Sequence, residues 1–494
     1  MQSVFGSAWN LGSYQFVATH ANQIDAVTAS GYMPKGGTPW TQERIDTFRT
    51  WIANDFPEGS PELDTTRTKA LLESGGPTRV RKDIRNLTEE EIERLAKAFS
   101  GIMNLSAEDI NSYFHNAGIH WLPAPNFYCM HHSPQFLSWH RAYQIVFENA
   151  LRTIEGCEEV TLPYWDITMN EELPEWLYQS PFSSYTYPQE VGPDFPAGQA
   201  TTRYPASEVL QNLKGVPGKS SDVFADVANA MSQHTWEAFN GFFAGADNDA
   251  LIAGHDNGHN STGRTMGNQE VAAFDPIFWL FHNNWDRLFW EWQKANNATT
   301  QEGILSRISG DQASHDAFSD PVAAQLSPFT DVDAKLNAID LINLHDWDIE
   351  YAPSASSPEF HAETLAATTM NTNRSAKTLH AAESFTVDQS MVHIRVEGIN
   401  RIRIPGSFRV HLLKDGKVIA TRPFFQPGNA KECENCVSNS IVHFDFKLPA
   451  KEVEGGKLGL EIELTDKNDG ETVPIASLGT PSIEVRMPLN KNNR

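Results

Sequence analysis

Cysteine and basic side chains are both scarce in this sequence of 494 residues. Four cysteines are too few to form a disulfide scaffold in a chain of this length, which agrees with a reducing compartment. Lysine and arginine together number 38 against 63 aspartates and glutamates, and the formal net charge is -25. Because binding to phosphate backbones depends on basic side chains, we expect no nucleic-acid partner and no attraction to anionic membrane surfaces.

Long apolar runs are also absent from the sequence. No stretch approaches about 18 consecutive apolar residues, the length that a membrane-spanning helix needs. The first residues, MQSVFGSAWNLGSYQF, do not contain the basic segment followed by an apolar segment of a secretion signal, so we expect a cytoplasmic protein without a membrane partner. With 40% hydrophobic residues the chain can still bury a large core, and its length predicts a globular enzyme of two to four domains.

The first two thirds of the chain show the apolar periodicity of helices. Residues 1–80 are interpreted as an N-terminal helical extension, and residues 81–350 as a mainly helical domain. Thr88 and Glu91 have the spacing of a capping box, which predicts a helix from this point. The next stretch, SAEDINSYFHNAG, predicts a second helix that is capped by Ser106.

The last part of the chain changes its period. Residues 351–384 are rich in Ala, Ser and Thr and are interpreted as a linker. In residues 385–494 apolar side chains alternate with polar ones, as on strands with one buried face, and Lys414–Lys417 is predicted to form the turn of a hairpin. These strands predict a small C-terminal antiparallel β-sandwich domain.

Eight of the 17 histidines fall in two short windows of the sequence. In the second window His255 and His259 lie one helical turn apart, so both imidazoles can reach one metal ion. His282 lies within a later apolar helix, where a single histidine would usually be a core residue, but the pair upstream favours a site of three imidazoles. The first window contains five histidines, of which three would make a matching site: His115, His120, His131, His132 and His140.

These residue types favour copper. Two sites of neutral imidazoles without carboxylate ligands fit copper, whereas di-iron and magnesium sites use carboxylates. Zinc is the alternative, since three histidines and a water form a catalytic zinc site. The metalloprotease motif HExxH is absent, because Asp256 stands where that motif has its glutamate. His131 and His132 are adjacent and cannot easily face the same way, so we expect one of them to be a bystander.

Four motifs in this region resemble those of the type-3 copper proteins, the family of tyrosinases, catechol oxidases and molluscan haemocyanin units. They are GIHWLP, YCMHHSPQFLSWHRAY, LPYWDIT and DPIFWLFHNNWDRLFW, and they occur in the family's order between Gly118 and Trp290. The resemblance implies a mainly α fold, whose four-helix bundle holds two copper ions and precedes the β-sandwich. It assigns the first copper to His120, His131 and His140, and the second to His255, His259 and His282.

The resemblance also implies a function. Copper-dependent oxidation by dioxygen would convert o-diphenols into o-quinones through a bridging dicopper peroxide, and monophenols such as tyrosine would be hydroxylated at the ortho position. The expected partners are dioxygen and small phenols, including tyrosine, L-DOPA and catechols, and the sequence is compatible with a homo-oligomer. Three alternatives are a catechol oxidase without activity on monophenols, a haemocyanin-like dioxygen carrier and a zinc hydrolase.

Two residues beside the histidines acquire roles from the resemblance. Asp256 stands where family members that hydroxylate monophenols usually carry Asn, and it could itself act as the catalytic base; a solvated aspartate at a helix end is the alternative. Cys129, two residues before His131, matches a cysteine whose sulfur forms a thioether bond with the imidazole in fungal tyrosinases. The alternative is a small buried thiol.

The stretch RPFFQPGNAKECENC resembles a loop of latent fungal tyrosinases, in which the sandwich domain covers the copper pocket. The resemblance implies that Phe424 fills this pocket, while the alternative places Phe424 and Phe425 in the sandwich core. Cys433 and Cys436 could form a disulfide, provide half of a zinc site or deliver Cu(I) to the copper site, since thiolates prefer that ion.

Overall fold

The computed structural model describes residues 42–53, 79–123, 128–241, 250–329, 337–353, 391–465 and 470–486, together with Ala21, Ile24 and Thr28. The chain divides into two compact units, Met1–Thr66 and Arg67–Arg494. Helix α3 (Gln42–Ala53) belongs to the first unit. Residues 354–384, most of the predicted linker, lie outside the described residues.

The described residues 79–353, which we call the helical domain, are built around three long buried helices. Helices α7, α11 and α12 are buried on almost every side, which places them at the centre of the main hydrophobic core. None of the described helices combines the length and apolar character that a membrane crossing requires. The helices are α5 (Glu89–Met103), α6 (Tyr113–Gly118), α7 (Phe136–Arg152), α8 (Ala206–Leu213), α9 (Val223–Met231), α10 (Trp236–Asn240), α11 (Leu251–Thr262), α12 (Ile277–Ala295), α13 (Gln301–Leu305) and α14 (Gln312–Ser319).

The first helices of this domain test the capping predictions. The capping box of α5 is confirmed: the Glu91 N–H donates to the Thr88 hydroxyl at 3.2 Å, and the Thr88 N–H donates to the Glu91 carboxylate at 2.9 Å. The predicted start of the next helix at Ser106 is wrong. Helix α6 starts at Tyr113, because the side chain of Ser112 is the one that accepts an N–H from its first turn.

Two short strands join the ends of the helical domain. Strand β1 (Arg79–Arg81) pairs in parallel with β2 (Ile349–Tyr351), so the chain enters and leaves the domain at the same place. Nothing in the sequence pattern predicted this pairing, since three residues are too few to show an alternation.

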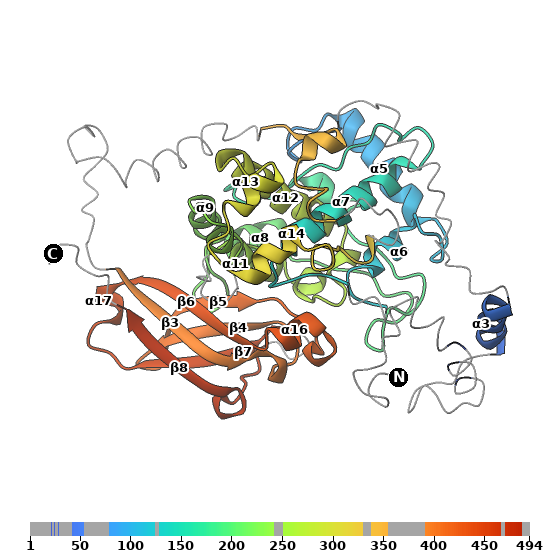
Figure 1. Cartoon of the computed structure of the whole chain (residues 1–494). Helices are drawn as coiled ribbons and strands as arrows, with labels where there is room; N and C mark the ends of the chain where they lie inside the picture. Colours follow the sequence, from blue (N-terminus) through green and yellow to red (C-terminus); the bar gives the residue numbers. More distant parts are fainter. Residues whose placement is uncertain are drawn as a thin grey trace. The chain divides into compact units, whose positions relative to one another are not determined.

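The described residues 391–486, which we call the sandwich domain, form the orange and red sheets in Figure 1. All strand pairings are antiparallel, in the orders β6-β3-β8 and β5-β4-β7, and apolar side chains from both sheets share one core. Asp415 and Gly416 have positive φ angles in the tight turn between β4 and β5, as predicted. The predicted fold class, mainly α with a C-terminal antiparallel β-sandwich, is confirmed. The elements are β3 (Met391–Asn400), β4 (Phe408–Lys414), β5 (Lys417–Phe424), α16 (Glu434–Ser438), β6 (Ile441–Pro449), α17 (Ala450–Val453), β7 (Leu458–Leu464) and β8 (Gly479–Arg486).

Candidate metal centre

Helices α11 and α12 carry the second group of histidines. His255 and His259 lie one turn apart on α11, and His282 lies on α12. The Nε2 atom of His259 is 3.1 Å from Nε2 of His255 and 3.3 Å from Nε2 of His282. Three ring nitrogens therefore converge on one place, and we call these residues the second trio.

Three further histidines, the first trio, meet beside the start of α7. His120 follows α6, His131 lies in the loop before α7, and His140 is on α7. The ring centroid of His131 is 5.1 Å from that of His120 and 5.0 Å from that of His140. The Nδ1 atom of His120 is 3.1 Å from the Gln269 carbonyl, and that of His140 is 2.8 Å from the Phe136 carbonyl. Among the described residues, the three Nε2 atoms have no hydrogen-bond partner.

The two trios lie against each other. The rings of His140 and His282 are stacked, with centroids 4.3 Å apart and 10° between their planes. The rings of His131 and His255 are 5.3 Å apart. All six imidazoles are buried and form one centre.

Burial keeps these imidazoles neutral. It lowers the pKa of His120 to about 3, and it lowers the pKa values of the other five as well. A neutral imidazole offers the lone pair that binds a metal ion. The buried Nε2 atoms of the first trio need such a partner, and no carboxylate lies among the ligand atoms of either trio. This donor set fits a binuclear copper site.

Asp256 follows His255 on α11 and is almost completely buried. Its Oδ1 lies 2.9 Å from Nδ1 of His255, and its Oδ2 lies 2.9 Å from Nε2 of His132. Oδ2 also accepts the backbone N–H of Phe425 at 3.0 Å. Burial opposes ionisation, but His132 and the hydrogen bonds from both histidines hold the pKa of Asp256 below its ordinary value. The alternative of a solvated aspartate is therefore wrong; the carboxylate orients the His255 ring, and its role as the catalytic base stays a prediction.

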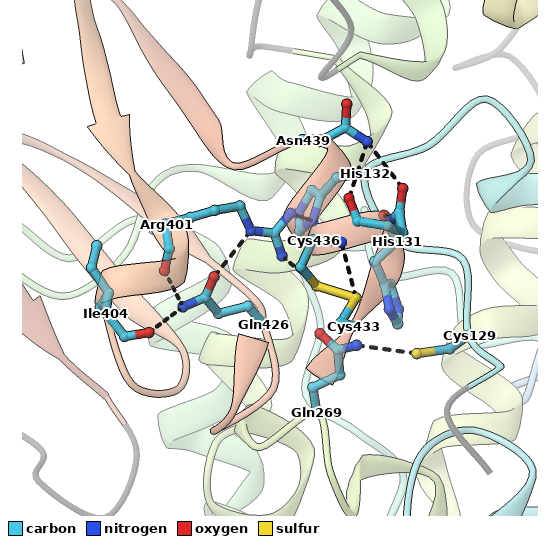
Figure 2. Close-up of a disulfide and its surroundings, with 11 residues drawn as sticks. Cys129, His131, His132, Gln269, Arg401, Ile404, Gln426, Cys433, Cys436 and Asn439 are labelled. Carbon is cyan, nitrogen blue, oxygen red and sulfur yellow. Dashed lines mark hydrogen bonds between the residues drawn. A yellow bond between two sulfur atoms is a disulfide. The ribbon is translucent and has the colours of Figure 1, made fainter. Parts of the chain in front are cut away.

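His132 belongs to neither trio, but it links the helical domain to the sandwich domain. Its Nδ1 lies 3.3 Å from Nη1 of Arg401, as Figure 2 shows, and its ring stacks on Phe424 with centroids 4.3 Å apart. Burial lowers the pKa of His132 to about 4. The neutral ring can therefore accept a hydrogen bond from Arg401 at Nδ1 and donate one to Asp256 from Nε2.

Cys129 lies beside the first trio. Its Sγ is within 4.8 Å of ring nitrogens of His120 and His131, and it accepts a hydrogen bond from the Gln269 side chain at 3.1 Å (Figure 2). Burial raises the pKa of this thiol. Cys129 takes part in no disulfide, and the thioether bond to His131 stays a prediction.

Two neighbouring phenylalanines at the end of β5 enter different domains. Phe424 lies in the sandwich core, where its ring stacks on Phe408 at 4.9 Å. The ring of Phe425 packs in the helical domain and stacks on His259, with centroids 3.9 Å apart and 11° between the planes. The prediction that Phe424 fills the copper pocket is therefore wrong by one residue. Side chains alternate along a strand, so the burial of Phe424 in the sandwich directs Phe425 to the histidines.

Cys433 and Cys436 form a disulfide, one of the three alternatives that the sequence left open. The pair packs against the core of the helical domain, and Nη2 of Arg401 lies 3.4 Å from Sγ of Cys436 (Figure 2). Between the two cysteines, the Asn435 side chain donates to the backbone oxygen of His131. In the disulfide form the pair has no thiolate, so the predicted delivery of copper by these cysteines cannot operate in this state.

Sequence reasoning missed three residues at this centre. Arg401 is 269 residues from His132 and Gln269 is 149 residues from His120, so no local spacing relates them. Phe425 was named only together with Phe424, and counting from the hairpin could not separate the two, because the β4–β5 register shifts between Leu412 and Leu413.

Comparisons with known proteins agree with this geometry. The sequence profile of the common central domain of tyrosinase matches residues 110–295, which include both trios. A tyrosinase of Aspergillus oryzae is 24% identical over 450 residues, 66% of this chain and 80% of that protein. Hemocyanin 1 of Megathura crenulata is 33% identical over 229 residues, 44% of this chain and only 6% of that protein. The structure of a tyrosinase from Burkholderia thailandensis, at 22% identity, has the same fold with a TM-score of 0.61, over 83% of this chain and 100% of that chain.

Proposed function

Because this chain belongs to the tyrosinase family of type-3 copper proteins, we propose that it oxidises o-diphenols to o-quinones with dioxygen. The observation that carries this proposal is the ring of Phe425, which lies 3.9 Å from the ring of His259 and 5.4 Å from that of His131. The centre therefore accommodates an aromatic ring against both trios. Two diphenols and one dioxygen give two quinones and two waters, so atoms and electrons balance.

We assign one copper ion to each trio: the first to His120, His131 and His140, the second to His255, His259 and His282. When bound, the two ions supply the one-electron chemistry that joins phenol oxidation to dioxygen reduction. The protein fixes the rings of several ligands through carbonyl and carboxylate partners at Nδ1, which directs their Nε2 atoms inward. Aromatic side chains such as Phe278 and Phe281 pack on the imidazoles and exclude water.

Ortho-hydroxylation of monophenols such as tyrosine is the finer part of the proposal. That reaction needs a group that accepts the phenolic proton. Asp256 is the carboxylate beside the second trio, but the Phe425 N–H occupies its Oδ2. We therefore expect hydroxylation only after the sandwich domain has moved away, and more slowly than diphenol oxidation.

The sandwich domain keeps the protein partly latent in this proposal. The Phe425 side chain is buried between the domains, and the contacts of Arg401 with His132 and of Asn435 with His131 hold the covering loop in place. A phenol can reach the histidines only when the Phe425 ring has left them.

A dioxygen carrier is the second candidate, favoured by the 33% identity to a hemocyanin. To separate the two functions, catechol is added to the copper-loaded protein before and after protease cleavage between residues 353 and 391. We expect quinone absorbance in both samples and a faster reaction after cleavage. Quinone in neither sample, with dioxygen still bound, would support the carrier. Metal analysis that finds zinc instead of copper would contradict both candidates.

A further inference from the structure

The side chain of Phe425 occupies the pocket beside the histidines, as a bound small molecule would. Its ring stacks on His259 at 3.9 Å and meets the edges of the His131 and His255 rings at 5.4 and 5.9 Å. Its backbone N–H donates to Oδ2 of Asp256 at 3.0 Å. The residue is therefore held at two points, through its ring and through its nitrogen.

The spacing between these two points is that of a known class of small molecules. In a phenylalanine residue, Cβ and Cα separate the ring from the backbone nitrogen. Two carbons separate the ring from the nitrogen in the 2-arylethylamines too, a class that includes tyramine and dopamine. A free amine of this class is protonated near neutral pH, so its hydrogen bond to Asp256 would be charge-assisted and stronger than that of the Phe425 amide.

The charges around the pocket favour the same class. Asp256 and Glu270 of the helical domain accept hydrogen bonds from the backbone of Phe425 and Gly428 in the covering loop. The cations that the sandwich domain brings to this face, Arg401, Arg409 and Arg422, leave together with that domain. The uncovered pocket is therefore negative, which attracts cationic side chains and repels anionic ones.

We propose that the open pocket selects phenols with a protonated 2-aminoethyl side chain, and that Asp256 determines this specificity. The phenol ring takes the place of the Phe425 ring on His259, and the ammonium takes the place of the Phe425 N–H on Oδ2. Phenols with a carboxylate side chain are disfavoured. Tyrosine and L-DOPA, which carry both charges, rank between the two. The oxidation of these phenols rests on the proposed function, but the selective binding does not.

A series of catechols with the same ring tests the proposal in the copper-loaded, full-length protein. Dopamine, 2-(3,4-dihydroxyphenyl)ethanol and 3,4-dihydroxyphenylacetate share the catechol ring, and their side chains end in a cationic, a neutral and an anionic group. The fraction of molecules with an open pocket multiplies all rates alike and cancels in ratios of kcat/KM. We expect dopamine to exceed the acetate by about tenfold or more, the effect of one charge-assisted hydrogen bond.

Two variants test whether Asp256 causes the preference for dopamine over the acetate. Asp256→Asn keeps the shape of the side chain and removes its charge, so the ratio of dopamine to acetate should fall severalfold even if all rates decrease. Asp226→Asn is the matched control, because it removes a carboxylate that pairs with Arg422 of the sandwich domain, whereas Asp256 is the one that accepts the Phe425 N–H. It changes how often the domains open but should leave the ratio unchanged. An equal ratio in wild type and Asp256→Asn, or a preference for the acetate, would overturn the proposal.

Equilibrium binding separates this proposal from the proposed function. Phenethylamine, 2-phenylethanol and phenylacetate carry no phenolic oxygen and cannot be oxidised to quinones, so calorimetry reports their binding alone. We expect the amine to bind most tightly, and less selectively in Asp256→Asn. Equal affinities, or no binding of the amine, contradict the proposal. Selective binding of the amine by a protein that oxidises no catechol contradicts the proposed function and leaves the specificity of the pocket intact.

Discussion

At the residue scale, Phe425 is the side chain that stands between the histidines and a substrate. Because its ring occupies the place of a phenol, Phe425→Ala in the full-length protein should open that place without disturbing the sandwich core. We expect catechol oxidation to become about two- to tenfold faster, which corresponds to the loss of one aromatic contact. Initial rates of quinone formation measure this change.

Phe424→Ala is the control for that variant. Phe424 packs on Phe408 and Phe444 inside the sandwich, so its truncation leaves a cavity that costs about 3–5 kcal/mol of sandwich stability. The stability of the sandwich domain should therefore fall strongly in Phe424→Ala and little in Phe425→Ala, whose ring packs in the helical domain, and thermal unfolding measures this difference. An unchanged oxidation rate in Phe425→Ala would show that its ring does not block the pocket.

The residues that could be predicted from the sequence are those related by local spacing. The separation of His255 and His259 by one helical turn is sufficient to place both rings on one face of α11. The contact between His132 and Asp256 joins residues 124 positions apart, and no periodicity encodes it. The phenylalanine in the pocket was misplaced by one residue, because the resemblance aligned the loop but did not fix which face of β5 was buried.

At the element scale, helix α11 contains two glycines, and only one of them lies where a side chain would not fit. A Cβ at Gly258 would lie 2.6 Å from the ring of Phe281 and 2.9 Å from Ile167, too close for any real contact. Gly258→Ala must therefore displace the Phe281 ring and the Ile167 side chain, or move α11 itself, at a cost of about 1–3 kcal/mol. Because α11 carries two members of the second trio, we expect copper content and melting temperature to fall together. Metal analysis and calorimetry measure both.

Gly254, one turn earlier on α11, provides the matched control. A Cβ there would lie 3.3 Å from a methyl group of Val227, which a small adjustment can relieve. Alanine also favours a helix over glycine by about 1 kcal/mol, so Gly254→Ala should retain its copper and its stability. Equal loss of copper in both variants would mean that the close packing at Gly258 is not the cause.

Elements were predictable where their own side chains determine them. The cap, the apolar residues of the buried face and the length of helix α5 all follow from one stretch of sequence, and the structure has the helix there. The start of α6 was misplaced because Ser106 and Ser112 both have the chemistry of a cap, and only the surrounding fold selects Ser112. Strands β1 and β2 exist through their pairing across most of the helical domain, which a local pattern cannot reveal.

At the scale of the whole molecule, buried ion pairs connect strand β1, where the helical domain begins, to the central helices α7 and α12. Glu148 on α7 contacts Arg79 and Arg81 of β1 at 3.1 and 3.0 Å, and Arg81 also lies 3.2 Å from Asp286 on α12. Glu148→Gln removes the charge that balances two buried arginines. We expect it to lower the free energy of unfolding by about 3–5 kcal/mol near neutral pH. Denaturant titration measures the loss.

The pH dependence of this loss identifies its origin. Burial alone would raise the pKa of Glu148, but Arg81, Arg79 and the Leu162 N–H hold it below its ordinary value of 4.5. Such a carboxyl stabilises the fold above pH 4.5, and its contribution disappears as the pH falls through the lower pKa of the folded state. The difference between wild type and Glu148→Gln should therefore shrink in acid. A difference that stays constant would point to lost packing instead of lost charge.

A partly buried ion pair between Arg422 on β5 and Asp226 on α9 joins the two domains. Arg422→Ala and Asp226→Ala should each favour the open state and raise the rate of catechol oxidation. The double variant should raise it by less than the product of the single effects, because either change alone already breaks the pair. The missing part corresponds to a coupling of about 0.5–3 kcal/mol.

Arg395→Ala is the control for this cycle, since Arg395 pairs with Asp445 inside the sandwich domain. It removes a partly buried arginine from the same domain without touching the contact with α9, so the oxidation rate should stay at the wild-type level. Strictly multiplicative effects of the two single changes would mean that Arg422 and Asp226 act independently. Each residue would then contribute to latency through contacts other than their ion pair.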